Sequence, residues 1–285
     1  MRITEDISEL RGIRRAMTGV FGLIPTMGAL HEGHASLIRR ARMECDHVGV
    51  SIFVNPTQFS PDEDLSKYPR MLETDLSLLE NLGVDAVWTP SPEAVYPAAH
   101  QTWITVDNVS KPLEGTIRPC HFRGVATIVA KLLNIFTPDR AYFGQKDAQQ
   151  AAVVRRMAAD LNFAADIVVS PTVREADGLA MSSRNAYLRA EERKAAPVLY
   201  RALSAAKTKF ESGVKNADIL KDVVLETLST EPLVNAQYVS AADPDTMEEL
   251  REISGGALLS AAVLIGKTRL IDNIILRGRE VCSWL

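Results

Sequence analysis

Short apolar runs alternate with amphipathic segments through most of the chain, and this alternation restricts the fold more than any other feature. Strand-like runs cover residues 20–24, 48–54, 85–88, 140–143 and 167–169, and helix-like segments cover residues 35–45, 69–83, 121–136 and 147–162. The run VGVSIFV (48–54) is continuously apolar and rich in β-branched residues, which is typical of a parallel strand buried on both faces. Strand, helix and strand in repetition predict an α/β fold, a Rossmann-like doubly wound parallel sheet with right-handed crossovers.

The pattern changes after residue 175. We expect helices over residues 190–211 and 217–230, with Pro197 disturbing the first turns of the former. Shorter strands are expected over residues 235–241 and 269–276, around an Ala-rich apolar run. The chain is therefore predicted to form two domains, residues 1–175 and a smaller α+β domain of residues 176–285.

Charge and cysteine content narrow the function classes. The chain has 32 Lys and Arg against 36 Asp and Glu, whereas nucleic-acid binders usually carry a basic excess. Cys45, Cys120 and Cys282 are widely spaced and form no CxxC pair, so neither a disulfide framework nor a structural zinc site is indicated. No apolar signal region begins the sequence, and the run at 257–266 is about half a membrane span. We expect a cytoplasmic enzyme that acts on small molecules, with no nucleic-acid or membrane partner.

The segment PTMGALHEGH (25–34) joins the first expected strand of this series to the first expected helix. Ligands of open α/β sheets bind beyond the carboxyl ends of the strands, and a helix start favours phosphate. Gly28 and Gly33 allow close approach of the backbone to an anion. His31 and His34, three residues apart, can both donate hydrogen bonds to phosphate oxygens. The pair could also be coincidental or ligate metal, although zincins space their histidines by four residues and place Glu between them.

Two further segments carry candidate phosphate ligands. FGQKDAQQ (143–150) follows a strand end, where Gly144 permits a tight turn, Asp147 can cap a helix and Lys146 can meet a phosphate. MSSRN (181–185) places hydroxyls and a guanidinium on a loop, which suits a phosphate clamp. A capped helix with a solvated lysine, and a polar loop between domains, are the plainer interpretations of these two strings.

A fourth segment, FVNPTQF (53–59), ends the second strand of the series. The amides of Asn55 and Gln58 could bind a small polar substrate, or Asn55 could simply stabilise a turn before Pro56. Three of the four segments follow predicted strand ends at one edge of one sheet, and this conjunction favours a shared ligand.

The four segments, in this order and together with DLSKYPR (64–70), HFRGVATIVAKL (121–132), DGLAMSSRNAYL (177–188) and LIDN (270–273), closely resemble the pantothenate synthetase (pantoate–β-alanine ligase) family. The resemblance covers nearly the whole chain and extends to the HxGH nucleotidyltransferase superfamily, in which MSSR corresponds to the mobile loop of class I tRNA synthetases. It implies an ATP-dependent condensation of pantoate with β-alanine through a pantoyl-adenylate intermediate. ATP with Mg²⁺, pantoate and β-alanine are the implied ligands.

The resemblance also assigns site residues. His34 is implied as the catalytic residue, with Gln58 and Gln150 binding pantoate, Gln58 also near β-alanine, and Asn55 in support. The implied ATP site comprises Met27, Gly28, Ala29, Leu30, His31, Glu32, Gly33, His34, Gly144, Gln145, Lys146, Asp147, Val173, Met181, Ser182, Ser183 and Arg184. No protein metal ligand is assigned; Mg²⁺ is expected on ATP phosphates and water, with Asp75 as a candidate contact.

The family further implies a homodimer formed through the amino-terminal domain and a carboxy-terminal domain that closes over the nucleotide. Two features depart from its pattern. Cys120 stands where the family usually has Gly before the HFRG string, which puts the local loop conformation in question, and the tail RGREVCSWL (277–285) extends past the usual end.

Two rival functions follow from the same motifs. One is another HxGH enzyme, such as a cytidylyltransferase for a phosphorylated alcohol, although paired amides suit a carboxylate and hydroxyls better than a second phosphate. The other is a nucleotide-binding module without chemistry, which the retention of both histidines, Lys146 and Arg184 disfavours. A synthetase acting on tRNA is disfavoured by the acidic balance.

Overall fold

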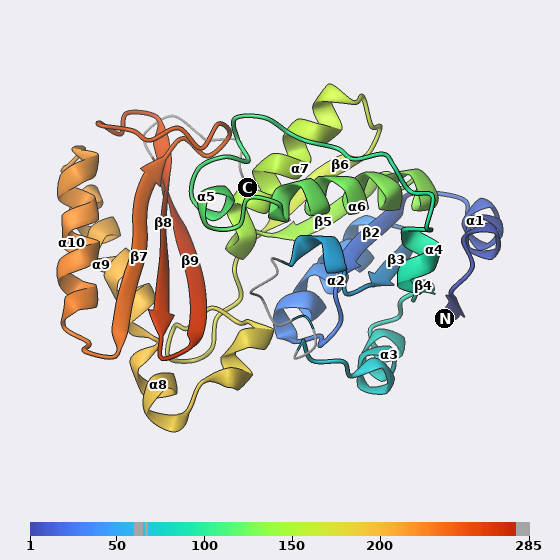
Figure 1. Ribbon diagram of the computed structural model, residues 1–285, viewed down its shortest axis with the longest axis horizontal. Helices are drawn as coiled ribbons and strands as arrows, with labels where there is room; N and C mark the ends of the chain where they lie inside the picture. Colours follow the sequence, from blue (N-terminus) through green and yellow to red (C-terminus); the bar gives the residue numbers. More distant parts are fainter. Residues whose placement is uncertain (60–64, 66–67, 278–285) are drawn as a thin grey trace. The chain divides into compact units, whose positions relative to one another are not determined.

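The computed structural model describes residues 1–59, 65 and 68–277. They form two compact units, residues 1–144 with 150–170, and residues 145–149 with 171–277 (Figure 1). In the described part of the chain, no helix has both the length and the apolar character needed to cross a membrane. Of the segments singled out above, the tail beyond Arg277 and part of DLSKYPR (Asp64, Ser66 and Lys67) lie outside the described residues.

The first unit contains a parallel sheet in the order β1-β4-β3-β2-β5-β6. Its strands are β1 (Arg2–Thr4), β2 (Phe21–Thr26), β3 (His47–Ile52), β4 (Ala86–Trp88), β5 (Arg140–Gly144) and β6 (Asp166–Ser170). Its longer helices are α1 (Ile7–Arg15), α2 (Glu32–Glu44), α3 (Leu72–Asn81), α6 (His121–Phe136) and α7 (Ala148–Asp160), whose first two residues belong to the second unit. Short helical turns are η1 (Pro56–Gln58), α4 (Pro92–Val95) and α5 (Glu114–Ile117). The predicted doubly wound α/β fold is confirmed.

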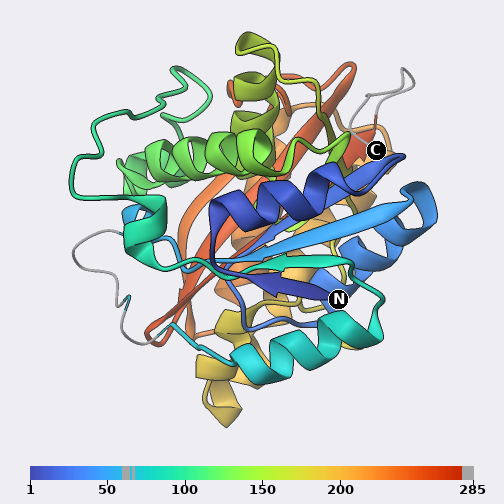
Figure 2. The ribbon, with the colours of Figure 1, turned by 90° about the vertical axis from the view of Figure 1, so that its right-hand side faces the viewer.

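Helices cover both faces of this sheet, with α2 and α3 on one face and α1, α6 and α7 on the other (Figure 2). On the first face, Ile24 and Val50 of the strands pack in one core with Leu37 and Ile38 of α2. On the second face, the ring of Phe21 lies 6.2 Å from that of Phe136 in α6. Central strands buried on both faces explain why their sequences are continuously apolar.

The order of connections reverses beside β2. The connection from β2 runs through α2 to β3, whereas the connection from β5 runs through α7 to β6 on the other side. Since β2 and β5 are hydrogen-bonded neighbours, their carboxyl ends mark a topological switch point, where α/β sheets bind ligands. The histidine segment follows β2 at this point, and Gly144 ends β5 there.

The second unit is an antiparallel sheet in the order β7-β8-β9. It comprises β7 (Val234–Ala242), β8 (Gly256–Ile265) and β9 (Thr268–Arg277), with α8 (Ala190–Ala195), α9 (Val198–Glu211), α10 (Ala217–Ser229) and the turns η3 (Gln145–Asp147) and η4 (Ser183–Tyr187). Helices α9 and α10 pack on one face of the sheet, with Leu203, Val224 and Leu259 in the shared core. The expected disturbance at Pro197 is confirmed, because α8 ends two residues before it and α9 begins directly after it.

Candidate active site

The turn after β2 has an unusual backbone that a buried carboxylate holds in place. Gly28 and Ala29 have φ values of 82° and 50°, and a Cβ at Gly28 would lie 3.1 Å from Asp75 Oδ2. The Asp75 carboxylate accepts hydrogen bonds from the backbone N–H groups of Ala29 (2.9 Å) and Leu30 (2.8 Å). Only 3% of Asp75 is exposed. Glycine is needed at position 28 both for the left-handed φ and for the approach of this carboxylate.

Asp75, the candidate contact for Mg²⁺, shapes the turn ahead of the histidines, because each of its oxygens accepts a backbone hydrogen bond from that turn. A contact of Asp75 with Mg²⁺ stays a prediction. Within the described ranges, no group of three or more His, Cys, Asp or Glu side chains is arranged to hold a metal ion.

Asp75→Asn is expected to destabilise the apo protein by about 1–3 kcal/mol, because the amide would set an N–H₂ group against a backbone N–H of the turn. The midpoint of urea unfolding, measured without nucleotide or Mg²⁺, tests this. Asp222→Asn on the exposed surface of α10 is the matched control, and equal midpoints for the two variants would contradict the assigned role.

His31 and His34 form a capping box at the amino-terminal end of α2. His31 Nδ1 accepts from the backbone N–H of Gly33 (3.1 Å), and His34 Nδ1 accepts from the backbone N–H of His31 (3.3 Å). The ring centroids are 4.2 Å apart. An Nδ1 that accepts a backbone hydrogen bond carries no proton, so in this arrangement each neutral ring has its hydrogen on Nε2. Both imidazoles are thereby set in the tautomer that can donate a hydrogen bond through Nε2.

Asn55 and Gln58 lie in the turn after β3 and are hydrogen-bonded to each other. Asn55 is 1% exposed, and its Nδ2 donates to Gln58 Oε1 (2.8 Å) and to the carbonyl of Gly124 (3.2 Å). Its Oδ1 accepts from the hydroxyl of Thr57 (2.9 Å). Because Gln58 Oε1 is held by Asn55, the Gln58 amide is oriented with Nε2 as its remaining donor group.

Helix α6 supports this turn. A Cβ at Gly124 would lie 2.5 Å from the carbonyl oxygen of Thr57, so only glycine permits this approach. The carbonyl of Gln58 lies 3.0 Å from Arg118 Nη2, which donates to it, and 2.9 Å from His121 Nδ1. Cys120 is exposed and directly precedes α6, which begins at His121 as the sequence predicts. Gln150, the other expected pantoate ligand, lies half-buried in the first turn of α7.

In the second unit, Lys146 lies in a tightly bonded turn. The Gln145 amide donates to Asn273 Oδ1 (3.1 Å), and Asn273 Nδ2 donates to the carbonyls of Gln145 (2.9 Å) and Lys146 (3.0 Å). Lys146 Nζ lies 3.5 Å from Asp147 Oδ1, and the lysine side chain is 16% exposed. The backbone that carries the ammonium group is therefore fixed from strand β9.

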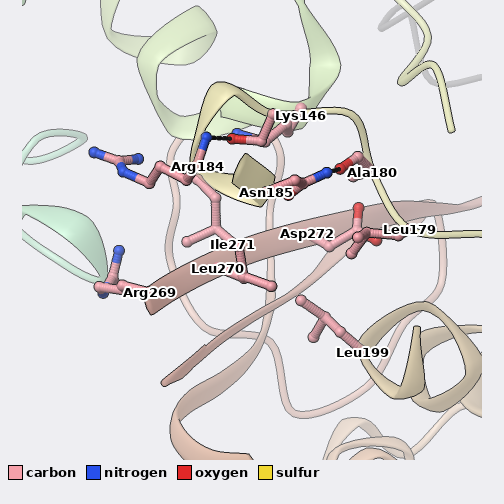
Figure 3. Close-up of a pocket in the computed structure, with 11 residues that line it drawn as sticks. Lys146, Leu179, Ala180, Arg184, Asn185, Leu199, Arg269, Leu270, Ile271 and Asp272 are labelled. Carbon is pink, nitrogen blue, oxygen red and sulfur yellow. Dashed lines mark hydrogen bonds between the residues drawn. The ribbon is translucent and has the colours of Figure 1, made fainter. Parts of the chain in front are cut away.

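Lys146, Ser182 and Arg184 line one pocket (Figure 3). Its remaining lining residues come from the 179–185 loop, α9 and β9, namely Leu179, Ala180, Asn185, Leu199, Arg269, Leu270, Ile271 and Asp272. The structure thus places a residue of the GQKD segment and two residues of the MSSR segment around one pocket. Such a group of donors suits phosphate oxygens.

Local hydrogen bonds order the loop that carries Arg184. Ser182 Oγ accepts from the backbone N–H of Arg184 (3.3 Å), and the N–H of Met181 donates to the carbonyl of Val173 (3.0 Å). Asn185 Nδ2 donates to the Ala180 carbonyl (3.1 Å). Arg193 of α8 pairs with Asp177 in the preceding turn and holds the pKa of that carboxyl below its usual value.

Several residues shape the site in ways that the sequence does not predict. Asp272 of β9 accepts two bonds from Arg174 (2.6 and 3.0 Å), and Arg174 also donates to the carbonyl of Gly178 (3.1 Å). Burial raises the pKa of the Asp272 carboxyl, while the Arg174 guanidinium acts in the opposite direction. Asp272 and Asn273 belong to the string LIDN, so the resemblance marks their position but not their structural role.

Comparisons with known proteins agree on one family. The family model described as pantoate-beta-alanine ligase matches residues 2–275. The pantothenate synthetase of Roseiflexus castenholzii is 56% identical over 278 residues, which cover 98% of this chain and 100% of that protein. The corresponding protein of Herpetosiphon aurantiacus is 53% identical over 97% of this chain and all of its own length.

Solved structures give the same result. The crystal structure of pantothenate synthetase from Thermus thermophilus has a TM-score of 0.93 and 44% identity, and the match covers 98% of this chain and 100% of that one. The pantoate-beta-alanine ligase of Francisella tularensis, complexed with beta-gamma ATP and beta-alanine, has a TM-score of 0.80 and 35% identity, with 96% and 97% covered.

Proposed function

The chain belongs to the pantoate–β-alanine ligase family, and we propose from this premise that His31, His34, Lys146 and Arg184 bind one ATP molecule. It is an ATP-dependent ligase that condenses pantoate with β-alanine to give pantothenate, AMP and pyrophosphate. The match along residues 2–275 carries this conclusion, because it includes each of the four motif segments. Neither the cytidylyltransferase nor the non-catalytic alternative is favoured by these matches.

The reaction runs in two half-reactions. The carboxylate oxygen of pantoate attacks the α-phosphorus of ATP, the bond to the β-phosphate oxygen breaks, and pyrophosphate leaves with the bonding electrons. The amine of β-alanine then attacks the acyl carbon of pantoyl adenylate, loses a proton and expels AMP. A carboxylate is a poor acyl donor, and adenylation gives it a good leaving group. The protein has to align the reactants and stabilise charge on the phosphates.

The two histidines act as hydrogen-bond donors in this proposal. Their Nδ1 atoms accept backbone hydrogen bonds, and their Nε2–H groups are therefore oriented donors for phosphate oxygens. A donor that is fixed before the reaction needs no reorganisation when charge moves onto the leaving pyrophosphate. His34 is the residue to which we assign the catalytic role.

Residues of the second unit complete the proposed ATP site. Lys146 supplies a point charge, and Arg184 supplies a planar group of donors to phosphate oxygens. Ser182 lines the same pocket as these two cations. The remaining ATP contacts that we propose are Met27, Gly28, Ala29, Leu30, Glu32, Gly33, Gly144, Gln145, Asp147, Val173, Met181 and Ser183.

Gln58 and Gln150 are the proposed pantoate ligands. The Gln58 amide has its oxygen bound by Asn55, so its N–H₂ group is the part suited to donate to a pantoate carboxylate or hydroxyl. We propose that the same N–H₂ group also donates to the carboxylate of β-alanine, which enters after pyrophosphate has left. Asn55 acts on the substrates through Gln58, because its own polar atoms already bond within the protein.

Four further assignments complete the proposal. Mg²⁺ is expected on the phosphates of ATP, where it would neutralise charge during displacement. The homodimer formed through the amino-terminal domain, the role of residues 176–285 as a lid and the cytoplasmic location are also proposed.

The direct test is a product assay. The purified protein, incubated with ATP, Mg²⁺, pantoate and β-alanine, is expected to form pantothenate, AMP and pyrophosphate in equal amounts. Omitting either acid should abolish formation of pantothenate. Release of ADP and phosphate in place of AMP and pyrophosphate would refute attack at the α-phosphate.

A further inference from the structure

Strand β9 carries two consecutive polar residues that are almost completely buried. Asp272 is 2% exposed and Asn273 is 3% exposed, whereas the neighbouring strand β8 presents mostly apolar residues to the core. A buried polar side chain costs stability unless its hydrogen bonds are satisfied, and an apolar residue would fill the same space without that cost. Packing alone therefore does not explain why polar side chains occupy these two buried positions.

Asn273 uses its whole side-chain amide on the turn around Lys146. Nδ2 donates to the backbone carbonyls of Gln145 (2.9 Å) and Lys146 (3.0 Å), and Oδ1 accepts from the Gln145 amide (3.1 Å). These three bonds join positions that lie 127 or 128 residues apart in the sequence. They fix the backbone on both sides of the lysine Cα.

Asp272 anchors Asn273 in turn. Its Oδ1 accepts from the backbone N–H of Asn273 (2.8 Å) and from Arg174 Nη2 (3.0 Å). Arg174 Cζ lies 3.8 Å from the ring centroid of Tyr200, so the guanidinium is also packed on α9. The residue that holds the Lys146 turn is thus itself held by a charged pair that cannot shift without losing several bonds.

We infer that Asn273 is a positioning residue for ATP binding, which fixes the Lys146 backbone so that this lysine lines the pocket it shares with Ser182 and Arg184. The inference rests on the proposed function for the identity of the ligand, and on the three side-chain hydrogen bonds for the role of Asn273. Asn273 is not among the residues that line this pocket, so its effect on binding passes through Lys146.

A double-mutant cycle on ATP affinity tests this role. The dissociation constant of ATP, measured by titration calorimetry, is expected to rise about tenfold in Asn273→Ala and at least as much in Lys146→Ala. In the double variant, the constant should stay within about twofold of that of Lys146→Ala, since Asn273 has nothing left to position. A double variant whose loss equals the product of the two single losses would overturn the inference.

A second variant of Asn273 and a control variant complete the test. Asn273→Asp keeps the size of the side chain but sets oxygens against the carbonyls of Gln145 and Lys146, so it should weaken ATP binding even if Asn273→Ala fails to fold. Asn235→Ala, an exposed position of β7, is the control and should bind ATP as the wild type does. The inference would also be overturned if the Asn273→Asp variant folded and bound ATP as tightly as this control.

The outcome separates this inference from the proposed function. A wild-type protein that binds ATP but makes no pantothenate would refute the proposed function, while the cycle on ATP affinity would still report the role of Asn273. A protein that makes pantothenate and shows no coupling between Asn273 and Lys146 would refute the inference alone.

Discussion

His34→Ala is expected to lower turnover by about two to three orders of magnitude, the scale for losing one preorganised hydrogen-bond donor at a reacting phosphate. The substitution removes the Nε2 donor and also the Nδ1 atom that accepts from the backbone of His31. Steady-state formation of pantothenate at saturating pantoate and β-alanine measures the loss. A variant within about threefold of wild type would remove His34 from the mechanism.

Two amide substitutions separate the catalytic role of His34 from its capping role. Asparagine can place an oxygen near the position of Nδ1, and glutamine can place its amide nearer the position of Nε2. His34→Asn should therefore keep the unfolding midpoint of the wild type but lose turnover, whereas His34→Gln should retain more turnover. The reverse order would show that the cap, and not the donor, is what activity depends on.

Lys146→Ala is expected to lower kcat/KM for ATP by about two orders of magnitude or more, because it would remove the proposed charge-assisted contact to a phosphate. The lysine side chain is only 16% exposed, and its backbone is bonded to Asn273. Kinetics with ATP as the varied substrate measure the effect.

The control for Lys146 is Lys194→Ala in α8, which removes a lysine that is 74% exposed and pairs with Glu191. An exposed pair of this kind contributes little to stability or activity. If Lys146→Ala reduced kcat/KM no more than Lys194→Ala did, Lys146 would not bind the phosphates.

The elements that the sequence predicted well are those with strong local signals. The β-branched run at 48–54 and the amphipathic segment at 121–136 correspond to β3 and α6, with the bounds of α6 predicted to the residue. Pro197 breaks the helical pattern where its ring excludes a continuous helix. Strand β1 and helix α1 are not among the predicted elements: β1 has only three residues, and α1 is short, with Leu10 as its one fully buried residue. The apolar run at 257–266, too short for a membrane span, forms most of β8.

In the candidate site, too, the residues with a local sequence signal could be predicted and those with distant partners could not. The histidine, GQKD and MSSR segments could be found because each is a compact string after a strand or in a loop. The residues that hold them could not, because Asp75 bonds to a turn 46 residues earlier and Asn273 bonds to a turn 128 residues earlier. No local pattern links a buried carboxylate to a distant backbone N–H group. The mutual capping of His31 and His34 is also visible only in three dimensions, although the spacing of three made it possible.

In the proposed order of steps, the chain uses ATP to adenylate pantoate before β-alanine enters. Exchange of labelled pyrophosphate into ATP isolates the adenylation step, because exchange needs the first half-reaction to run in both directions and needs nothing from the second. With Mg²⁺ and pantoate alone, label should enter ATP, and with β-alanine alone it should not. Exchange supported by β-alanine in the absence of pantoate, or none with pantoate, would show that pantoate is not adenylated first.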